Sequence, residues 1–129
     1  MSSNDNGNGY LEYVYERAQK LTEALYRVTD FFSESEPLKW LLRRDSLAIF
    51  ESILKIKTAS PNERIRALEQ ISEKIRQSIR TLELASSGSF ISEANFQVLK
   101  REYLHLADYL VERRYEILPE PSAAGFIGH

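Results

Sequence analysis

The stretch YLEYVYERAQKLTEALYRVTDFF, residues 10–32, places apolar residues at alternating spacings of three and four. They are Leu11, Val14, Ala18, Leu21, Leu25, Val28 and Phe32. Because a helix turns once in about 3.6 residues, this spacing keeps one apolar stripe along a single helical face. Further stretches with the same periodicity follow, separated by short breaker segments. The pattern predicts an all-α fold, an antiparallel up-and-down four-helix bundle over residues 10–117.

Breaker residues predict where the inner helices begin. Pro37 and Pro61 each suit the first turn of a helix, so a second helix is expected over about 38–57. Ser60 and Glu63 have the spacing of a capping box at the start of the third helix. These short connections predict that sequential helices run antiparallel.

The last junction and the two chain ends complete the expected layout. Gly88 suits a left-handed cap after the third helix, and Ser92 suits the N-cap of the fourth. Residues 1–9 are small and polar, which predicts a disordered N-terminal segment, and residues 118–129 are expected to form a flexible tail.

The third and fourth helices carry their own expected core stripes. For the third helix they are Ile65, Leu68, Ile75, Ile79 and Leu82, with Ser72 as the polar exception. For the fourth they are Phe96, Leu99, Tyr103, Leu106, Leu110 and Ile117. Both stripes are typical of helices that pack on one side.

Composition excludes several classes of protein. The chain has 129 residues, no cysteine and a formal charge of −2. The lack of cysteine excludes disulfides and thiolate zinc sites and fits a cytoplasmic location. No stretch approaches the roughly 20 apolar residues of a membrane span, and the N-terminus does not read as a secretory signal. The net charge argues against a protein that coats nucleic acid through its overall field.

The second helix is apolar on most of its sides, which is more than one bundle seam requires. Either the loops cover the surplus or a second subunit does, and we favour a homo-oligomer. Trp40, Leu47 and Leu54 follow one another by seven along one face and are the candidate oligomer interface.

The same helix carries the main basic segment of the chain. Over residues 38–58, five basic residues face two acids, an excess of three positive charges. Arg43 and Arg44 are therefore candidate nucleic-acid contacts, which Arg76 and Arg80 of the third helix would extend. Because acids are interleaved on the other helices, weak or undetectable binding is expected.

Candidate chemical sites are weak. Glu102 and His105 have a spacing seen in di-iron bundles, but no other helix offers an equivalent pair, so a solvated or interhelical His105 is expected. Asp45 either acts as a base in a cleft or, as we favour, pairs with a nearby arginine. Tyrosines on the first and fourth helices are read as the border of the core rather than a stacking surface. No catalytic motif, metal site or cofactor site is expected.

Two segments carry a resemblance to a known family. They are LLRRDSLAIFESILK at 41–55 and the junction LELA at 82–85 with FIS at 90–92. Over roughly residues 21–110 the chain resembles the four-helix-bundle family of the accessory variability determinant of diversity-generating retroelements and of ribosomal-RNA intervening-sequence proteins. The resemblance implies a ring-shaped homo-pentamer that binds a reverse transcriptase and nucleic acid. Arg43 and Arg44 resemble the basic positions of the family's second helix, whereas the acidic charge of this chain departs from the family pattern.

Two function hypotheses follow from these observations. The first is a non-enzymatic oligomeric accessory protein that supports a reverse transcriptase or an RNA partner. The second is a small regulatory or dimerisation module that binds another protein. An enzyme is not expected, because no activated nucleophile or matched acid and base is recognisable in the sequence.

Overall fold

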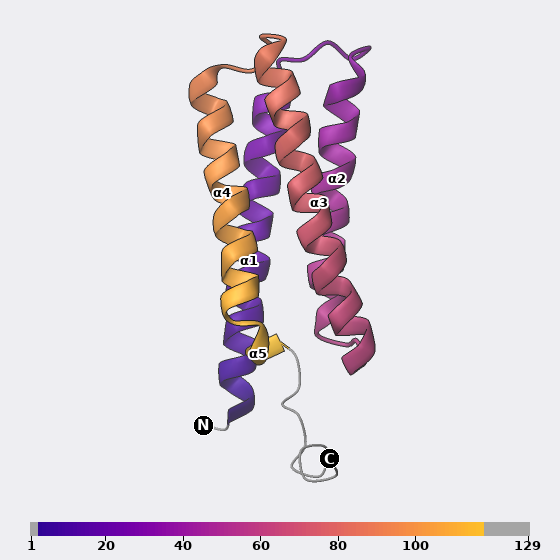
Figure 1. Ribbon diagram of the computed structural model, residues 1–129, viewed down its shortest axis with the longest axis vertical. Helices are drawn as coiled ribbons and strands as arrows, with labels where there is room; N and C mark the ends of the chain where they lie inside the picture. The colour runs from indigo at the N-terminus through magenta and orange to yellow at the C-terminus, as the bar shows by residue number, and fades with distance from the viewer. Residues whose placement is uncertain (1–2, 118–129) are drawn as a thin grey trace.

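The computed structural model describes residues 3–117, and this part of the chain is helical without strands. Four long helices, α1 (Ser3–Thr29), α2 (Pro37–Ile56), α3 (Pro61–Ser87) and α4 (Glu93–Glu112), precede a single turn, α5 (Arg114–Ile117). Figure 1 shows the four long helices side by side and alternating in direction. The predicted all-α four-helix bundle is confirmed.

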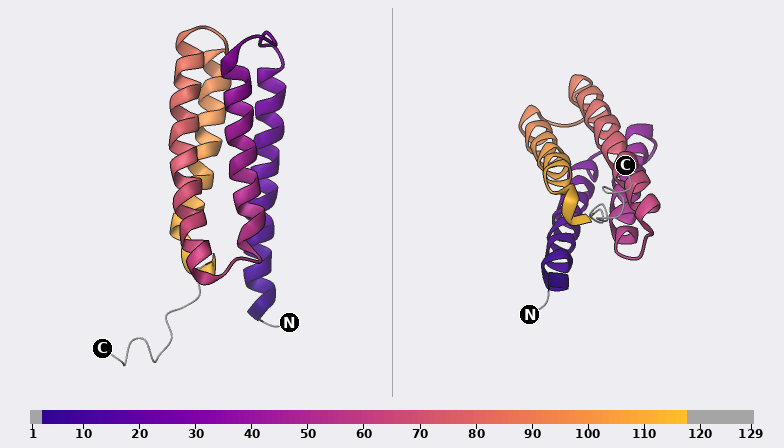
Figure 2. Two further views of the ribbon diagram at one scale, coloured as in Figure 1. Left: turned by 90° about the vertical axis from the view of Figure 1, so that its right-hand side faces the viewer. Right: turned by 60° about the horizontal axis from the view of Figure 1, so that its bottom comes forward.

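Each helix packs against its neighbours in sequence, and α1 and α4 also pack together and close the bundle. The views in Figure 2 show this arrangement from the side and from below. None of the helices within residues 3–117 combines the length and apolar character that a membrane span needs.

The core follows the predicted stripes of α1 and α4. All six residues expected from the fourth helix are buried, from Phe96 to Ile117, and on α1 Val14 and Leu25 are fully buried. The α2 contribution comes from one side of that helix. Its apolar members are Leu42, Ile49, Ile53 and Ile56.

The predicted stripe of α3 is wrong at its N-terminal end. Ile65 is 46% exposed, whereas Ile71, which the prediction omitted, is 1% exposed. Ile65 lies roughly 120° around the helix from the buried face. The three residues from Ile65 to Leu68 and the seven from Leu68 to Ile75 both fall short of whole turns of 3.6 residues, so the predicted stripe winds around the helix instead of staying on one face. Arg64 takes the core-facing position instead, and its Nη1 donates a 2.7 Å hydrogen bond to Ile117 O.

The predicted starts of α2, α3 and α4 are confirmed. Glu63 N donates a 3.3 Å hydrogen bond to Ser60 Oγ, and Ser60 N donates a 2.7 Å hydrogen bond to Glu63 Oε1. These two bonds form the predicted capping box at the start of α3. Ser92 Oγ likewise accepts from the backbone N–H of Asn95, as expected of the α4 N-cap.

The predicted left-handed Gly88 is wrong by one residue. Gly88 has a φ of −84°, and Ser89 adopts the left-handed conformation with a φ of 63°. Ser89 N donates to Ser86 O at 3.0 Å and Phe90 N donates to Ala85 O at 2.8 Å, so the end of α3 is a Schellman motif with Ser89 at its left-handed position. Glycine is still favoured at 88, because a Cβ there would lie 2.9 Å from Phe90 Cε2.

Both ends of the bundle differ from the prediction. Because α1 begins at Ser3, residues 3–9, which we predicted to be disordered, are helical. Extending an existing helix gains a hydrogen bond for each residue added, which can carry it through weak formers such as glycine and asparagine. The predicted fourth helix divides at Arg113 into α4 and α5. The predicted tail, 118–129, lies outside the described residues.

Candidate interaction surface

The three candidate interface residues lie on the face of α2 that points away from the core. Trp40, Leu47 and Leu54 are 47%, 43% and 48% exposed. They follow one another at intervals of seven, so they form a stripe on one side of α2, opposite the buried face of the helix. We call these three residues the outer α2 stripe. Large apolar side chains exposed in one row tend to mark an interface.

Trp40 is held in place by contacts on its inner side. Its Nε1 donates a 2.7 Å hydrogen bond to Glu34 O. Lys39 is 1% exposed, its Nζ lies 5.2 Å from the Trp40 ring centroid, and the same nitrogen donates to Glu34 Oε1 at 2.7 Å. A fixed, half-exposed tryptophan loses little conformational freedom when it binds a partner, which suits it to anchor an interface.

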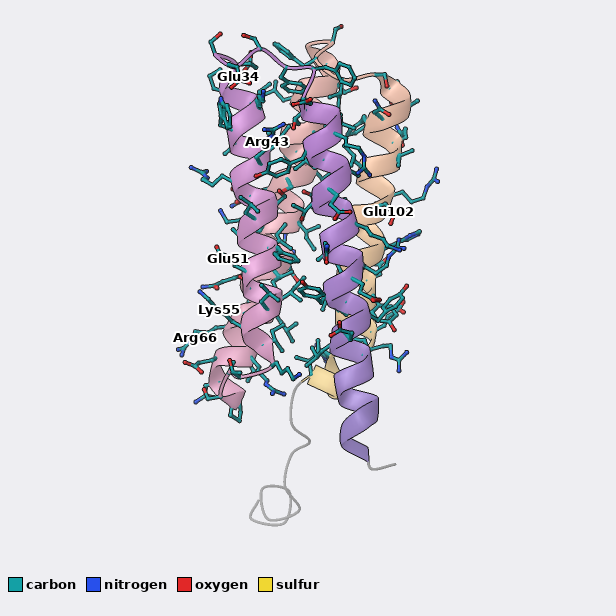
Figure 3. The ribbon with its side chains drawn as sticks, turned by 180° about the vertical axis from the view of Figure 1, so that it is seen from behind. Glu34, Arg43, Glu51, Lys55, Arg66 and Glu102 are labelled. Atoms are coloured by element: carbon teal, nitrogen blue, oxygen red, sulfur yellow. The ribbon has the colours of Figure 1, made fainter. Side chains whose placement is uncertain are left out.

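Charged side chains line one edge of the outer α2 stripe. Arg44 has a 71% exposed side chain, and Glu51 and Lys55 are exposed further along the helix. Figure 3 shows Glu51 and Lys55 pointing outward from α2. Among the side chains that the structure describes, neither Glu51 nor Lys55 forms an ion pair. The edge therefore offers both signs of charge to a partner.

Arg43, a candidate nucleic-acid contact, is bound within the bundle. Its side chain is 13% exposed. The guanidinium donates to Thr29 Oγ1 at 2.9 Å and to Tyr26 O at 3.1 Å, and it lies 4.3 Å from the centroid of the Tyr26 ring. These contacts attach α2 to the end of α1, so Arg43 has a structural role in the protein.

The other candidate arginines each lie beside a carboxylate. Arg76 lies 2.6 Å from Glu73, and Arg80 lies 3.5 Å from Glu83, one helical turn along α3 in each case. Arg76 also lines a groove between α3 and α4. Arg44 lies on α2 with its Nε 3.5 Å from the Asp45 carboxylate, so each of these three arginines has a carboxylate close to it.

Asp45 pairs with basic groups, as the sequence analysis favours. It is 3% exposed, and its Oδ1 lies 3.5 Å from both Arg44 Nε and Lys74 Nζ. The hydroxyls of Ser78 and Tyr103 are buried and have no hydrogen-bond partner among the described residues. Burial raises the pKa of Tyr103, with the Asp45 charge adding to the shift and the nearby Ser78 hydroxyl opposing it. Tyr103 is therefore neutral and gives no sign of a catalytic role.

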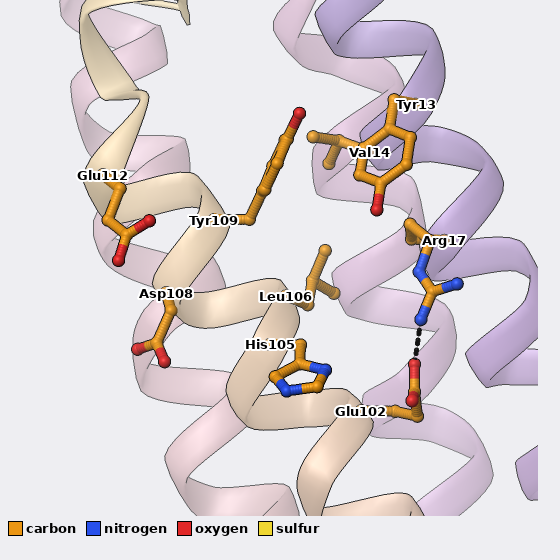
Figure 4. A pocket seen from close by; sticks show the side chains of 9 residues that line it. All are labelled: Tyr13, Val14, Arg17, Glu102, His105, Leu106, Asp108, Tyr109 and Glu112. Carbon is orange, nitrogen blue, oxygen red and sulfur yellow. Dashed lines mark hydrogen bonds and ion pairs between the residues drawn. The ribbon is translucent and has the colours of Figure 1, made fainter.

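A second surface feature is the groove between α1 and α4 shown in Figure 4, with a volume of about 330 Å³. Arg17 and Glu102 form an ion pair across it. His105 is exposed beside this pair. Among the His, Asp and Glu side chains that the structure describes, no three come close enough together to hold a metal ion.

The tyrosines of the same groove pack on one another, as expected for the border of a core. Tyr10 stacks on Tyr109 with ring centroids 5.0 Å apart, and Tyr10 Oη donates a 2.9 Å hydrogen bond to Tyr109 O. The ring of Tyr13 lies 4.8 Å from that of Tyr109. These rings join α1 to α4 by packing on one another, and Tyr13 remains 45% exposed.

Further exposed apolar side chains, which the sequence analysis did not single out, lie toward the end of the bundle that holds the α1–α2 and α3–α4 loops. Phe31 is 88% exposed, Leu84 60% and Phe90 43%. Phe31 comes directly before the buried Phe32, and Leu84 lies off the buried stripe of α3. Their exposure could have been predicted from the sequence, because each is a large apolar residue that lies outside the predicted core stripes.

Comparison with known proteins gives no relative for this chain. No protein-family model matches it, and neither a curated protein nor a solved structure matches it at a significant level. The outer α2 stripe and its charged edge are thus the features of the described residues on which a functional argument can be built.

Proposed function

We propose that the protein is a non-enzymatic accessory protein, a homo-oligomer of helical bundles that supports another macromolecule. The observation that carries this proposal is the outer α2 stripe, three large apolar side chains in one row on the solvent side of the bundle. The segments at 41–55, 82–85 and 90–92 that resemble the retroelement accessory family support a reverse transcriptase or an RNA as the partner. A cytoplasmic location accords with the cysteine-free sequence.

Physical reasons favour self-association through α2. The buried face of this helix already fills its place in the core, so Trp40, Leu47 and Leu54 are surplus to the fold of one chain. Covering them removes apolar surface from water, which is the main driving force of most protein association. The family resemblance implies a ring of five copies, and the mass of the particle in solution will distinguish a ring from a smaller oligomer.

The second candidate is a small regulatory or dimerisation module whose partner is another protein. The exposed Phe31, Leu84 and Phe90 favour it, because they are large apolar side chains in solvent that do not belong to the outer α2 stripe. The internal role of Arg43 also favours a protein partner. This residue resembles a basic position of the accessory family, but its guanidinium is bound to α1 and is not free to contact nucleic acid.

Light scattering coupled to size-exclusion chromatography tests self-association at tens of micromolar protein. We expect the parent chain to have a mass larger than one chain, and Leu47→Glu and Leu54→Glu to approach the monomer mass. Val98→Glu is the matched control, because Val98 is 50% exposed on α4 and lies away from α2. A monomeric parent, or folded variants of unchanged mass, would refute the proposal.

A further inference from the structure

We propose that the partner of the outer α2 stripe is α2 of a second copy, packed antiparallel across a two-fold axis beside Leu47. The inference rests on the proposed self-association and adds its geometry. In this arrangement Leu47 meets Leu47 of the second copy, Trp40 meets Leu54, and Arg44 meets Glu51. Such an interface is isologous, so the assembly closes as a dimer.

The apolar residues have the spacing that such an axis requires. Trp40 and Leu54 lie seven residues before and seven residues after Leu47. When two identical helices run antiparallel about Leu47, each Trp40 lies level with Leu54 of the other copy. The large indole therefore faces the smaller leucine at both ends, and two tryptophans never compete for one place.

The charges fit the same axis. The midpoint of Arg44 and Glu51 falls between Leu47 and Ala48, within one residue of the apolar centre. At about 100° per residue, Arg44 and Glu51 lie on the same edge of the stripe, with Lys55 beyond them. A two-fold axis between antiparallel helices brings like edges together, so each Arg44 lies level with Glu51 of the other copy.

A parallel arrangement loses this match. In a parallel pair related by a two-fold axis along the helices, the edge of α2 that carries Arg44 and Glu51 would lie on opposite sides of the pair in the two copies, so neither charge would meet a partner of opposite sign across the axis. In a head-to-tail ring, each contact joins two different surfaces of the chain. The α2 edge of one copy would then not meet the α2 edge of the next, and Arg44 would not face Glu51. The pattern on α2 therefore favours the antiparallel dimer over both alternatives.

The charged groups concerned are available to a partner. Glu51 is exposed and makes no ion pair within the described part of the chain. Arg44 contacts the buried Asp45 through Nε at 3.5 Å, and most of its side chain remains in solvent. One pair of 20-residue helices makes a contact about 30 Å long, at the small end of specific interfaces, so a micromolar dissociation constant is expected.

Cysteine cross-linking tests the register, and the natural sequence contains no cysteine to interfere. Under mild oxidation, Leu47→Cys should form a covalent dimer with itself. Trp40→Cys alone and Leu54→Cys alone should not, but an equal mixture of the two should cross-link. Val98→Cys on α4 serves as the control for random collision, since Val98 is 50% exposed.

Charge exchange tests the polar half of the proposal. Arg44→Glu and Glu51→Arg should each weaken dimerisation roughly tenfold, because each creates two like-charge contacts across the axis. The double variant restores opposite charges and should return the dissociation constant to within about threefold of the parent. Circular dichroism checks that every variant folds.

The outcomes separate this inference from the broader proposal. A dimer whose Trp40→Cys variant cross-links with itself is parallel, which overturns the inference but keeps self-association. A five-chain particle in which Leu47→Cys does not cross-link also overturns the inference but keeps self-association. A parent chain that stays monomeric at tens of micromolar removes both.

Discussion

Arg43 Nε donates a 2.9 Å hydrogen bond to Thr29 Oγ1, which joins α2 to the last residue of α1. Thr29 is fully buried and its hydroxyl donates in turn to Leu25 O at 2.8 Å. The Arg43 guanidinium also donates to Tyr26 O, one of the carbonyls at the end of α1. A cation at a helix C-terminus is favourable, because the carbonyls there carry the negative end of the helix dipole.

Replacing Arg43 by alanine should lower the free energy of unfolding by about 2 kcal/mol, because it leaves buried acceptors at the end of α1 without their charged donor. Arg43→Lys should restore part of the loss, since lysine keeps the charge without the planar fork. Urea unfolding followed by circular dichroism measures both. Arg80→Ala is the control, with an expected change within about 0.5 kcal/mol, because that side chain is 85% exposed. Equal losses at the two positions would contradict the structural role of Arg43.

Ser89→Gly should stabilise the protein by roughly 0.5 to 1 kcal/mol. Ser89 has a φ of 63°, a conformation that costs a residue with a side chain more than it costs glycine. Ser87→Gly is the matched control two residues earlier, where the chain is still helical, and it should destabilise the protein. Thermal unfolding of the two variants compares the signs, and a stability loss in both would refute the left-handed role of Ser89.

Acid should weaken the start of α3 through Glu63. The hydrogen bond from the Ser60 backbone, followed by the Ser60 side chain, holds the pKa of Glu63 below its ordinary value of 4.5. A carboxyl with a lowered pKa in the folded state contributes stability above pH 4.5, and that contribution is lost as the pH falls through the lowered value. Glu63→Gln should therefore flatten the fall in urea midpoint below pH 5 or so. A Glu63→Gln variant whose urea midpoint falls as steeply with acid as that of the parent would contradict this role of Glu63.

Tyr103→Phe should leave stability unchanged or raise it by about 1 kcal/mol, because the Tyr103 hydroxyl is buried and no described residue forms a hydrogen bond with it. Tyr10→Phe is the contrasting variant, since it removes the 2.9 Å hydrogen bond to Tyr109 O, and it should lose about 1 kcal/mol. Urea midpoints of the two variants give the comparison. A loss in Tyr103→Phe would show that this hydroxyl and that of Ser78 bond to each other in solution.

Most of the fold could be predicted from local rules. The period of the stripes, the prolines in the first helical turns and the Ser60–Glu63 capping box are short-range features, and the structure confirms them. Ile65 was wrongly assigned to the core because its spacing to Leu68, and that of Leu68 to Ile75, do not match whole helical turns. Which face of α3 is buried also depends on the neighbouring helices. The left-handed Ser89 was missed because glycine is preferred there in general, while here Gly88 is needed for its closeness to Phe90.

The candidate surface could be predicted only in part. The exposure of the Trp40, Leu47 and Leu54 face follows from the surplus of apolar positions on α2, which a sequence reveals. The role of Arg43 could not be predicted, because its hydrogen-bond partners lie on α1. The sequence does not show which face of α2 turns toward α1. Charge counting alone treats a buried arginine and an exposed one as equal.

Nucleic-acid binding by the free protein is expected to be weak or undetectable. Arg43 is bound to α1, and Arg44, Arg76 and Arg80 each lie within 3.5 Å or less of a carboxylate, in a chain of net charge −2. An antiparallel α2 dimer would further engage Arg44 with Glu51, which reduces the positive charge open to phosphate.

Fluorescence anisotropy with single-stranded and duplex RNA and DNA at low salt measures this prediction, and no saturation below the micromolar range is expected. Arg44→Glu is the variant to use, because Arg43→Glu would also disturb the fold and could not report on phosphate contact alone. Arg80→Glu, at the most exposed of these arginines, serves as the second probe. Submicromolar binding that falls steeply with salt and that Arg44→Glu abolishes would overturn this expectation. That result would favour a nucleic-acid partner over a protein partner, since counterion release from phosphate is the source of such salt dependence.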